Sequence, residues 1–174
     1  MATKMLMSAR VRFLVLFIAT FSCLQLAFVA SDGSSLQRRL IDDVTVRPAA
    51  HLIDVVYPQD HVLASGPSLL SQRVRLNVLR GCEGTEAMFL LIAAVLAFPA
   101  SRRSKIKALL VGCLIAYCAN QLRILALYAV ARDGRHWFEL VHGYLAPGLM
   151  VLSIGLYFTL WIEGNLSSRT PVEV

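Results

Sequence analysis

Charged side chains are scarce in this chain of 174 residues, at 16% of the total, where an average soluble domain has about 25%. Hydrophobic residues make up 57%, against roughly 45–50% in a soluble domain, and the mean hydropathy is +0.63. A soluble fold of this size would expose too much apolar surface. That class is therefore excluded, together with disordered, collagen-like and disulfide-rich secreted chains. We expect a small integral membrane protein.

Metal and nucleic-acid motifs are also missing. The 4 cysteines form no CxxC pair, no cysteine–histidine spacing is typical of zinc, and no HExxH motif supports a metal site of Cys82, Glu86, His136 and His142. The net charge is +6, but no basic face carries interleaved aromatics, so we expect no nucleic-acid partner. We expect no cofactor and no metal, and we interpret the basic excess as a membrane-orientation signal.

Four apolar runs predict an all-α bundle of four transmembrane helices. At 1.5 Å per residue the runs measure roughly 24–35 Å, which matches a hydrocarbon core of about 30 Å. We expect the first run to be an uncleaved anchor, because Phe28 stands where a cleavage site needs a small residue; a cleaved signal peptide is the alternative. The expected order is a cytoplasmic N-terminus (1–12), helix 1 (13–30), an extracytoplasmic segment (31–84), helix 2 (85–100), a cytoplasmic basic loop (101–107), helix 3 (108–130), an extracytoplasmic loop (131–142), helix 4 (143–162) and a cytoplasmic tail (163–174).

The orientation in the membrane is predicted from how densely basic residues are clustered in the loops. Outside the helices the lysines and arginines divide equally between the two sides of the membrane, so their total settles nothing. The short loop 101–107, however, holds Arg102, Arg103, Lys105 and Lys107. Short loops carry the orientation signal best, so we expect both termini in the cytoplasm.

The long segment 31–84 has strand character close to its end. Two short runs, 61–65 and 72–79, flank Gly66, Pro67 and Ser68, and polar and apolar residues alternate from Arg73 to Val78. This alternation is typical of a half-buried strand. We expect a small extracytoplasmic β-hairpin that leads to Cys82, with a solvated linker as the alternative.

Three chemically capable side chains are expected at one membrane face. Cys82 precedes the second run, Arg123 lies within about 10 Å of the outer end of the third, and His142 opens the fourth. An ionisable residue inside a membrane helix is a functional candidate by default. Cys82 is the only cysteine outside an apolar run, and the dipole of the helix that follows would favour its thiolate. Pro147 also predicts irregular backbone beside His142.

Two further residues are candidates for supporting roles. Glu86 follows Cys82 by four residues, so it shares a helix face with it and could pair with Arg123 or orient His142; we favour the pairing. Asn120 lies one turn before Arg123 on the same face. His136 is the rival base, and a snorkelling Arg123, an inert Cys82 and an interfacial His142 are the structural alternatives.

The motifs that hold these residues resemble those of the exosortase/archaeosortase family, and most closely its compact exosortase H subtype. The similar stretches are Gly81-Cys82-Glu83-Gly84, then Asn120-Gln121-Leu122-Arg123-Ile124, then His142. They follow the order of the family's C-x-G, N-x-x-R and single-histidine signatures. Many members have more spans and a serine after the cysteine, where this chain has four predicted spans and Glu83.

The resemblance implies a bacterial inner-membrane cysteine protease or transpeptidase, multi-pass, with its active site facing the periplasm. Its partners would be the lipid bilayer and the C-terminal sorting signal of exported proteins, which consists of a short motif, a transmembrane helix and a basic tail. Cys82, Arg123 and His142 would be catalytic, with Glu86 and Asn120 supporting them. The alternatives are a non-enzymatic membrane scaffold or assembly factor, and a small cofactor or metal carrier that uses His142.

Overall fold

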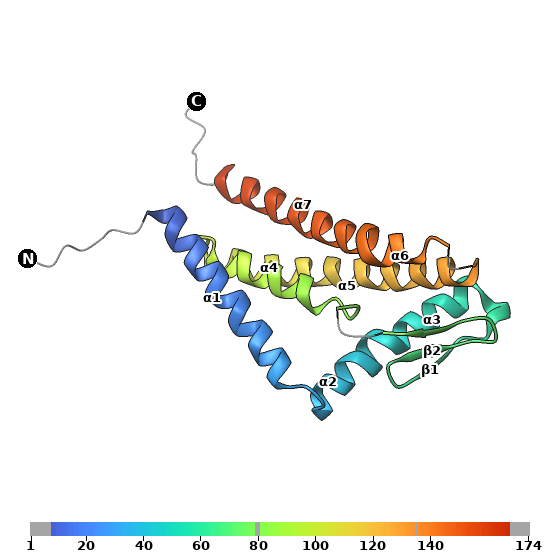
Figure 1. Cartoon of the computed structure of the whole chain (residues 1–174). Coiled ribbons are helices and arrows are strands. Elements are labelled where there is room, and N and C mark those ends of the chain that lie inside the picture. Colours follow the sequence, from blue (N-terminus) through green and yellow to red (C-terminus); the bar gives the residue numbers. More distant parts are fainter. Residues whose placement is uncertain (1–7, 79–80, 135, 168–174) are drawn as a thin grey trace, which may run out of the picture.

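The computed structural model describes residues 8–78, 81–134 and 136–167, and most of them are helical (Figure 1). The membrane-type helices are long, and a mixed helix–strand segment lies between the first two of them. In order the elements are α1 (Ala9–Ala30), α2 (Ser35–Arg39), the π-helix η1 (Leu40–Val46), α3 (Arg47–Val56), the 3₁₀ turn η2 (Pro58–Asp60), β1 (Leu63–Ser65), β2 (Ser68–Leu70), β3 (Arg75–Asn77), α4 (Thr85–Ala97), α5 (Arg102–Arg132), α6 (Phe138–Leu140), the π-helix η3 (Val141–Leu145) and α7 (Ala146–Ser167).

Helices α4, α5 and α7 pack around a core of small and branched apolar side chains. Leu91 of α4 and Ala116 of α5 are fully buried, and Ile154 of α7 packs against them. A Cβ on Gly112 would lie 2.5 Å from Leu91 Cδ2 and 2.6 Å from Tyr157 Cε1, so this glycine lets the helices approach closely. Helix α1 diverges from this bundle and touches α4, where Phe28 meets the ring of Phe89 edge-on (Figure 1).

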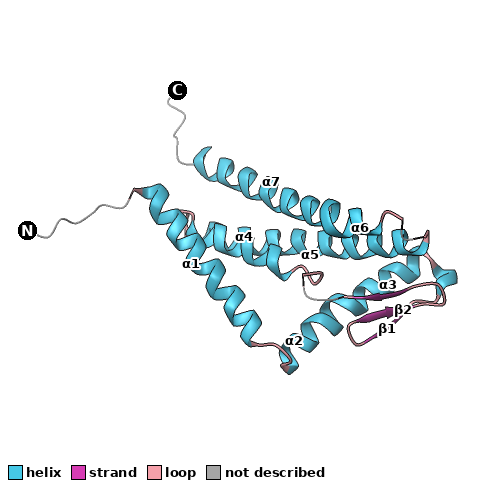
Figure 2. Ribbon diagram, in the orientation of Figure 1, coloured by secondary structure: helices cyan, strands magenta, loops and turns pink. Residues whose placement is uncertain are grey.

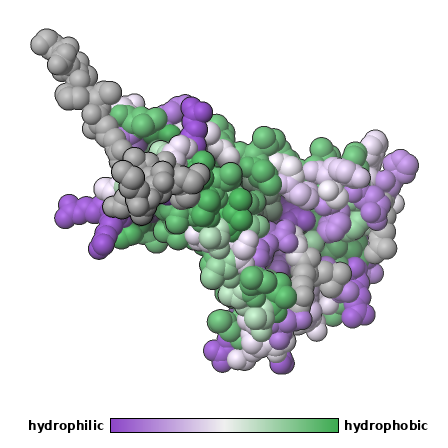
Figure 3. Space-filling view, turned by 60° about the vertical axis from the view of Figure 1, so that its left-hand side comes forward, coloured by the Kyte–Doolittle hydropathy of each residue, from purple (hydrophilic) through white to green (hydrophobic). Residues whose placement is uncertain are grey.

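Within the part of the chain that the structure describes, three helical stretches have the length and apolar composition needed to cross a membrane: 9–30, 102–132 and 138–167. The second predicted helix, 85–100, differs from expectation, because α4 ends at Ala97, where Phe98 is extended and Pro99 follows. Its 13 residues measure only about 20 Å, short of a hydrocarbon core of about 30 Å. The four-span count therefore stays a prediction. In the space-filling view hydrophobic residues form large patches on the left and centre of the face shown, and hydrophilic residues lie mainly at its margins, with some between the patches (Figure 3).

Both predicted short loops are partly helical. α5 begins at Arg102, because the Ser101 side chain caps it by accepting a hydrogen bond from the Ser104 N–H, so the cations of 101–107 lie on its first turns. Within the predicted loop 131–142, helix resumes at Phe138. The basic cluster thus sits on a helix end and not on a flexible connection.

The segment before α4 is not a solvated linker, and it holds more than the single hairpin that we expected. It contains the helices α2 to η2 and a three-stranded antiparallel sheet of order β1-β2-β3 (Figure 2). The turn that we expected at 66–68 ends at residue 67, and Ser68 is the first residue of β2. The strand forms here because Leu69 is fully buried and occupies a strand position that faces the core. A second turn follows, in which the Ser71 N–H donates to the Val74 carbonyl, and it adds β3.

The buried apolar side chains of the described residues form two cores. The sheet core joins α3, the strands and the C-terminal half of α5, and it includes Ile53, Leu69, Tyr128 and Cys82. The bundle core belongs to α4, α5 and α7. Cys82 therefore belongs to the sheet core, and it lies shortly before the helix α4, whose apolar side chains belong to the bundle core.

Candidate active site

Cys82 lies in a tight turn that two glycines make possible. Gly81 has φ +84° and Gly84 has φ +79°, both in the left-handed region that favours glycine. Gly84 is also the residue that caps α4. A Cβ on Gly84 would lie 2.8 Å from the Cγ of Asn120, so the turn packs directly against α5. This contact fixes the height of the Cys82 side chain along α5.

Arg123 reaches from α5 to the same turn. Its Nη1 donates to the Gly81 carbonyl at 2.9 Å, and its Nη2 lies 3.8 Å from Cys82 Sγ. Nη1 also lies 3.9 Å from the sulfur of Met150 on α7. The Nε atom is buried and has no hydrogen-bond partner among the described residues. The guanidinium is thus held against the thiol with one donor unused.

His142 approaches Cys82 from the helical turn directly before α7. Its Nδ1 lies 3.9 Å from Cys82 Sγ, and its ring stacks on Phe138 at 5.5 Å between centroids and 9° between planes. It belongs to the π-helix η3, which precedes Pro147 by a few residues. Since proline lacks the N–H that an α-helix needs, this irregular backbone agrees with the expectation from the sequence.

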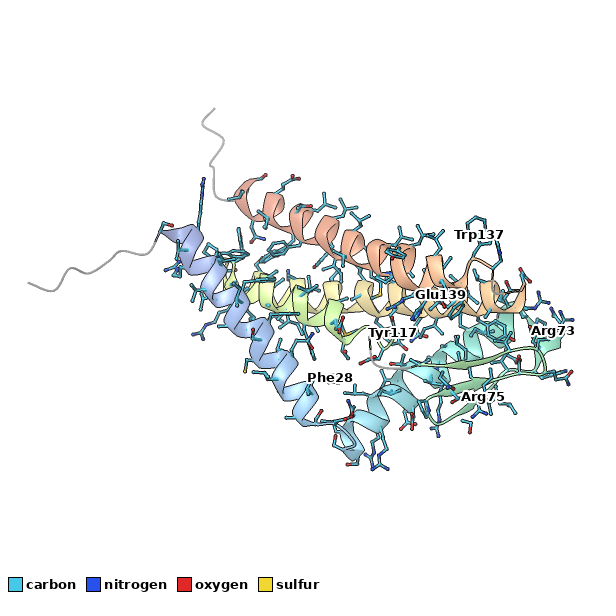
Figure 4. All side chains as sticks on the ribbon, in the orientation of Figure 1. Phe28, Arg73, Arg75, Tyr117, Trp137 and Glu139 are labelled. Carbon is cyan, nitrogen blue, oxygen red and sulfur yellow. The ribbon has the colours of Figure 1, made fainter. Side chains whose placement is uncertain are left out.

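The structure therefore brings together the three predicted residues, from three separate elements. Cys82 and His142 line a pocket of about 410 Å³ between the sheet, α5 and the residues that precede α7, whereas Arg123 lines the neighbouring pockets on the α4 and α7 sides. The lining of the first pocket comprises Arg75, Leu76, Asn77, Val78, Cys82, Ile124, Leu127, Phe138, Glu139 and His142. Arg75 comes from the strands and Glu139 from α6 (Figure 4). A thiol, an imidazole and a guanidinium at this spacing can carry out acyl transfer.

Burial sets the electrostatics of the thiol. It raises the pKa of Cys82 above its ordinary value; the charge of Arg123 acts in the opposite direction, and those of Glu83 and Glu86 add to the rise. The sequence predicted a thiolate favoured by the dipole of α4. That prediction is wrong for this state, because Cys82 is 9% exposed and desolvation outweighs the favourable charges.

The two supporting candidates differ in outcome. Asn120 is 1% exposed and packs on the Cys82 turn, and its Oδ1 has no hydrogen-bond partner within the described part of the chain. Glu86 makes no ion pair with Arg123 and no hydrogen bond with His142, so the pairing that we favoured is absent. Both Glu86 and Arg123 instead line a second, smaller pocket, between α4 and α7.

The other histidines lie away from the thiol. His136 is exposed and meets the ring of Trp137 edge-on, and His51 and His61 are also exposed. No group of three or more potential metal ligands occurs in the described ranges. His142 is therefore the imidazole that can act on Cys82.

Sequence reasoning missed the polar cluster that fixes the sheet to α5. Asp60 is 1% exposed; Tyr128 Oη donates to its carboxylate at 3.0 Å and Arg132 Nε at 2.8 Å. Burial alone would raise the pKa of Asp60, but these hydrogen bonds and the charges of Arg132 and Arg73 lower it below its ordinary value. Asp60 and Arg132 are 72 residues apart, so no local pattern could pair them.

Two residues of α5 hold the helical part of the same segment. Tyr117 Oη donates to the Val44 carbonyl at 3.0 Å, and Gln121 Nε2 donates to the Thr45 carbonyl at 3.4 Å. Gln121 lies within the Asn120–Ile124 stretch singled out from the sequence. Residues 117–123 of α5, about two turns, thus contact the Cys82 turn and the π-helix η1, and they include Arg123.

The fold and the pocket define a multi-pass membrane protein in which a cysteine, an arginine and a histidine lie together beside the start of α4 and the start of the last helix. The transmembrane exosortase family model matches residues 6–161. The chain belongs to this family, whose members act on the C-terminal sorting signals of exported proteins and sit in the membrane. Membership indicates a membrane protease or transpeptidase. No curated protein and no solved structure matches the chain.

Proposed function

We propose that the protein is a bacterial inner-membrane cysteine protease or transpeptidase that removes the C-terminal sorting signal of exported proteins through a thioester. The observation that carries the proposal is the position of Cys82 Sγ, 3.9 Å from His142 Nδ1 and 3.8 Å from Arg123 Nη2. A nucleophile within reach of both a base and a cationic donor is the arrangement that covalent acyl transfer requires.

The first step forms the acyl-enzyme. The Cys82 thiol proton passes to His142 Nδ1 as the sulfur attacks the scissile carbonyl, and the carbonyl oxygen becomes an oxyanion. The intermediate then collapses: the C–N bond breaks, His142 returns the proton to the leaving amine, and a thioester on Cys82 remains. In the second step, water or an acceptor amine attacks the thioester carbonyl and gives a proton to His142. The C–S bond then breaks, and His142 returns the proton to the sulfur, which restores the thiol.

The raised pKa of Cys82 explains why a base is needed. A buried thiol with a pKa above its ordinary value is protonated at neutral pH, so no thiolate waits in the resting enzyme. His142 must therefore accept the proton during attack. Its ring is held for this purpose by the stacking on Phe138.

Arg123 has the geometry of an oxyanion donor. It is anchored through Nη1 to the Gly81 carbonyl, its Nη2 points to the sulfur, and its Nε is unused among the described residues. A fixed donor of this kind typically contributes about 10²–10³ in rate. Because the site is poorly solvated, the guanidinium charge acts there with little screening.

The membrane part of the substrate has a place beside this cluster. An apolar groove between α5 and α7, lined by Ala119, Leu122, Ala126 and Leu149 among others, also includes Arg123 in its lining. A transmembrane helix of the substrate in this groove would bring its outer end to Cys82. Its basic tail would then lie at the anionic cytoplasmic leaflet, which supports an active site on the periplasmic side.

The test compares cysteine variants in cells. Exported proteins whose C-terminal anchor is removed with the wild-type enzyme are identified by mass spectrometry of their C-termini. We expect Cys82→Ala to abolish this removal at unchanged enzyme abundance, and the matched controls Cys113→Ala and Cys118→Ala to retain it. Normal processing with Cys82→Ala would refute the nucleophile and leave the scaffold alternative.

A further inference from the structure

The strand β3 forms one edge of the sheet, and some of its main-chain groups make no hydrogen bond with any described residue. In the β2–β3 pair the Val78 N–H donates to the Pro67 carbonyl and the Ser71 N–H to the Val74 carbonyl. Because such bonds alternate along an antiparallel pair, the N–H and C=O groups of Arg75 and Asn77 point away from β2. No described residue bonds to them. A free edge of this kind is a template for another strand.

This free edge faces the candidate active site. Four consecutive residues, 75–78, line the same pocket as Cys82 and His142, and Glu139 lies on the α6 side of that pocket. Val78 packs in the same apolar core as Cys82. Since Asn77 precedes Cys82 by five residues, their Cα atoms lie at most about 18 Å apart.

We propose that the extended motif of the sorting signal pairs with the free edge of β3 as a fourth strand, and that this pairing delivers the scissile bond to Cys82. The inference rests on the proposed function and names how the substrate is held. An extended strand advances about 3.3 Å per residue, so the paired residues lie within about five residues of the scissile bond. Main-chain hydrogen bonds would supply affinity, and alternate side chains would supply specificity.

The opposite edge of the sheet provides a matched control. In β2 the main-chain groups of Leu69 point to β3, so those of Ser68 and Leu70 point to β1 and bond to Ser65 and Leu63. The main-chain groups of Ala64, between these two residues of β1, therefore point away from the sheet. That edge lies on the α3 side, where the neighbouring Val62 N–H donates to Asp54 Oδ1. Ala64 is exposed and is not part of the Cys82 pocket.

The first experiment removes one outward N–H from each edge. Arg75→Pro deletes the N–H that faces the pocket, Arg75→Ala keeps it, and Ala64→Pro deletes an N–H on the far edge. The readout is the rate of anchor removal from an exported protein that wild-type cells cleave and Cys82→Ala cells do not. We expect Arg75→Pro to be at least about tenfold slower than Arg75→Ala, which loses the same side chain but keeps the N–H; that factor corresponds to about 1.4 kcal/mol. We expect Ala64→Pro to remain close to wild type.

A second measurement does not depend on the folding of a proline variant. A photo-crosslinking phenylalanine replaces Asn77 or Ala64 in the Cys82→Ala enzyme, which retains uncleaved substrate. We expect a crosslink to the exported protein from position 77, within five residues of its cleavage site, and none from position 64. Equal crosslinking at both positions, or an Arg75→Pro variant as fast as Arg75→Ala, would overturn the strand pairing. Normal cleavage by Cys82→Ala would instead overturn the proposed function itself.

Discussion

Replacement of Gly84 by alanine tests how the Cys82 turn is positioned. A residue with a Cβ at φ +79° costs about 1–2 kcal/mol in the left-handed region. The new Cβ would also lie 2.8 Å from Asn120 Cγ, and overpacking of this kind costs about 1–3 kcal/mol. The turn must therefore move away from α5, and Cys82 moves with it. A displacement approaching 1 Å reduces the rate of a positioned reaction by about 10²-fold.

Gly81→Ala is the matched control for this prediction. Gly81 has φ +84°, and a Cβ there meets nothing within 4 Å, so its substitution adds backbone strain without a collision. The assay measures enzyme abundance, thermal stability in detergent and the rate of anchor removal. We expect Gly84→Ala to lower the rate about 10²-fold, Gly81→Ala to lower it far less, and Gly84→Ala with Asn120→Ala to recover part of the loss. Equal rates for the two glycine variants would refute the role of the Asn120 contact.

Three further predictions follow from the described contacts. Arg123→Lys keeps the charge, but a lysine has one nitrogen and cannot contact both the Gly81 carbonyl and the sulfur as the guanidinium does. We expect the rate of anchor removal to fall about 10²–10³-fold at near-normal enzyme abundance. Full activity of this variant would exclude the oxyanion role. The pKa of Cys82 is raised by burial, so its alkylation by a small neutral reagent should keep accelerating above pH 9; a plateau below pH 8 would contradict the raised pKa. The pKa of Asp60 is lowered in the folded protein, so its carboxylate stabilises the fold above the unfolded pKa of about 3.9, and this stabilisation is lost as the pH falls further. We expect Asp60→Asn to melt at a lower temperature than wild type at pH 7, by a difference that shrinks in acid. A difference that stays constant with pH would contradict the assignment.

The convergence of the three site residues could be predicted from the sequence. Successive helices alternate in direction, so residues before the second, late in the third and at the start of the fourth fall at one face. Cys82, Arg123 and His142 do meet, within 3.9 Å of the sulfur. Pro147 likewise predicted the irregular backbone beside His142, because the lack of a proline N–H is a local property.

Features that depend on distant residues could not be predicted. The strand at Ser68–Leu70 forms because Leu69 fills a core made by α3 and α5, which the local pattern does not contain. The Asp60–Arg132 pair links elements 72 residues apart. The state of the thiol is a third example, since its pKa depends on burial by the sheet core, whose residues come from α3, the strands and α5.

Isolation of the acyl-enzyme tests the central claim most directly. Membranes that hold the enzyme and an uncleaved substrate are quenched in acid, which preserves thioesters, and the enzyme is digested and analysed by mass spectrometry. We predict a substrate fragment attached to the peptide that contains Cys82, released by neutral hydroxylamine and absent from the Cys82→Ala enzyme. Cleaved substrate with no hydroxylamine-sensitive adduct on Cys82, or an adduct on a different residue, would contradict the account.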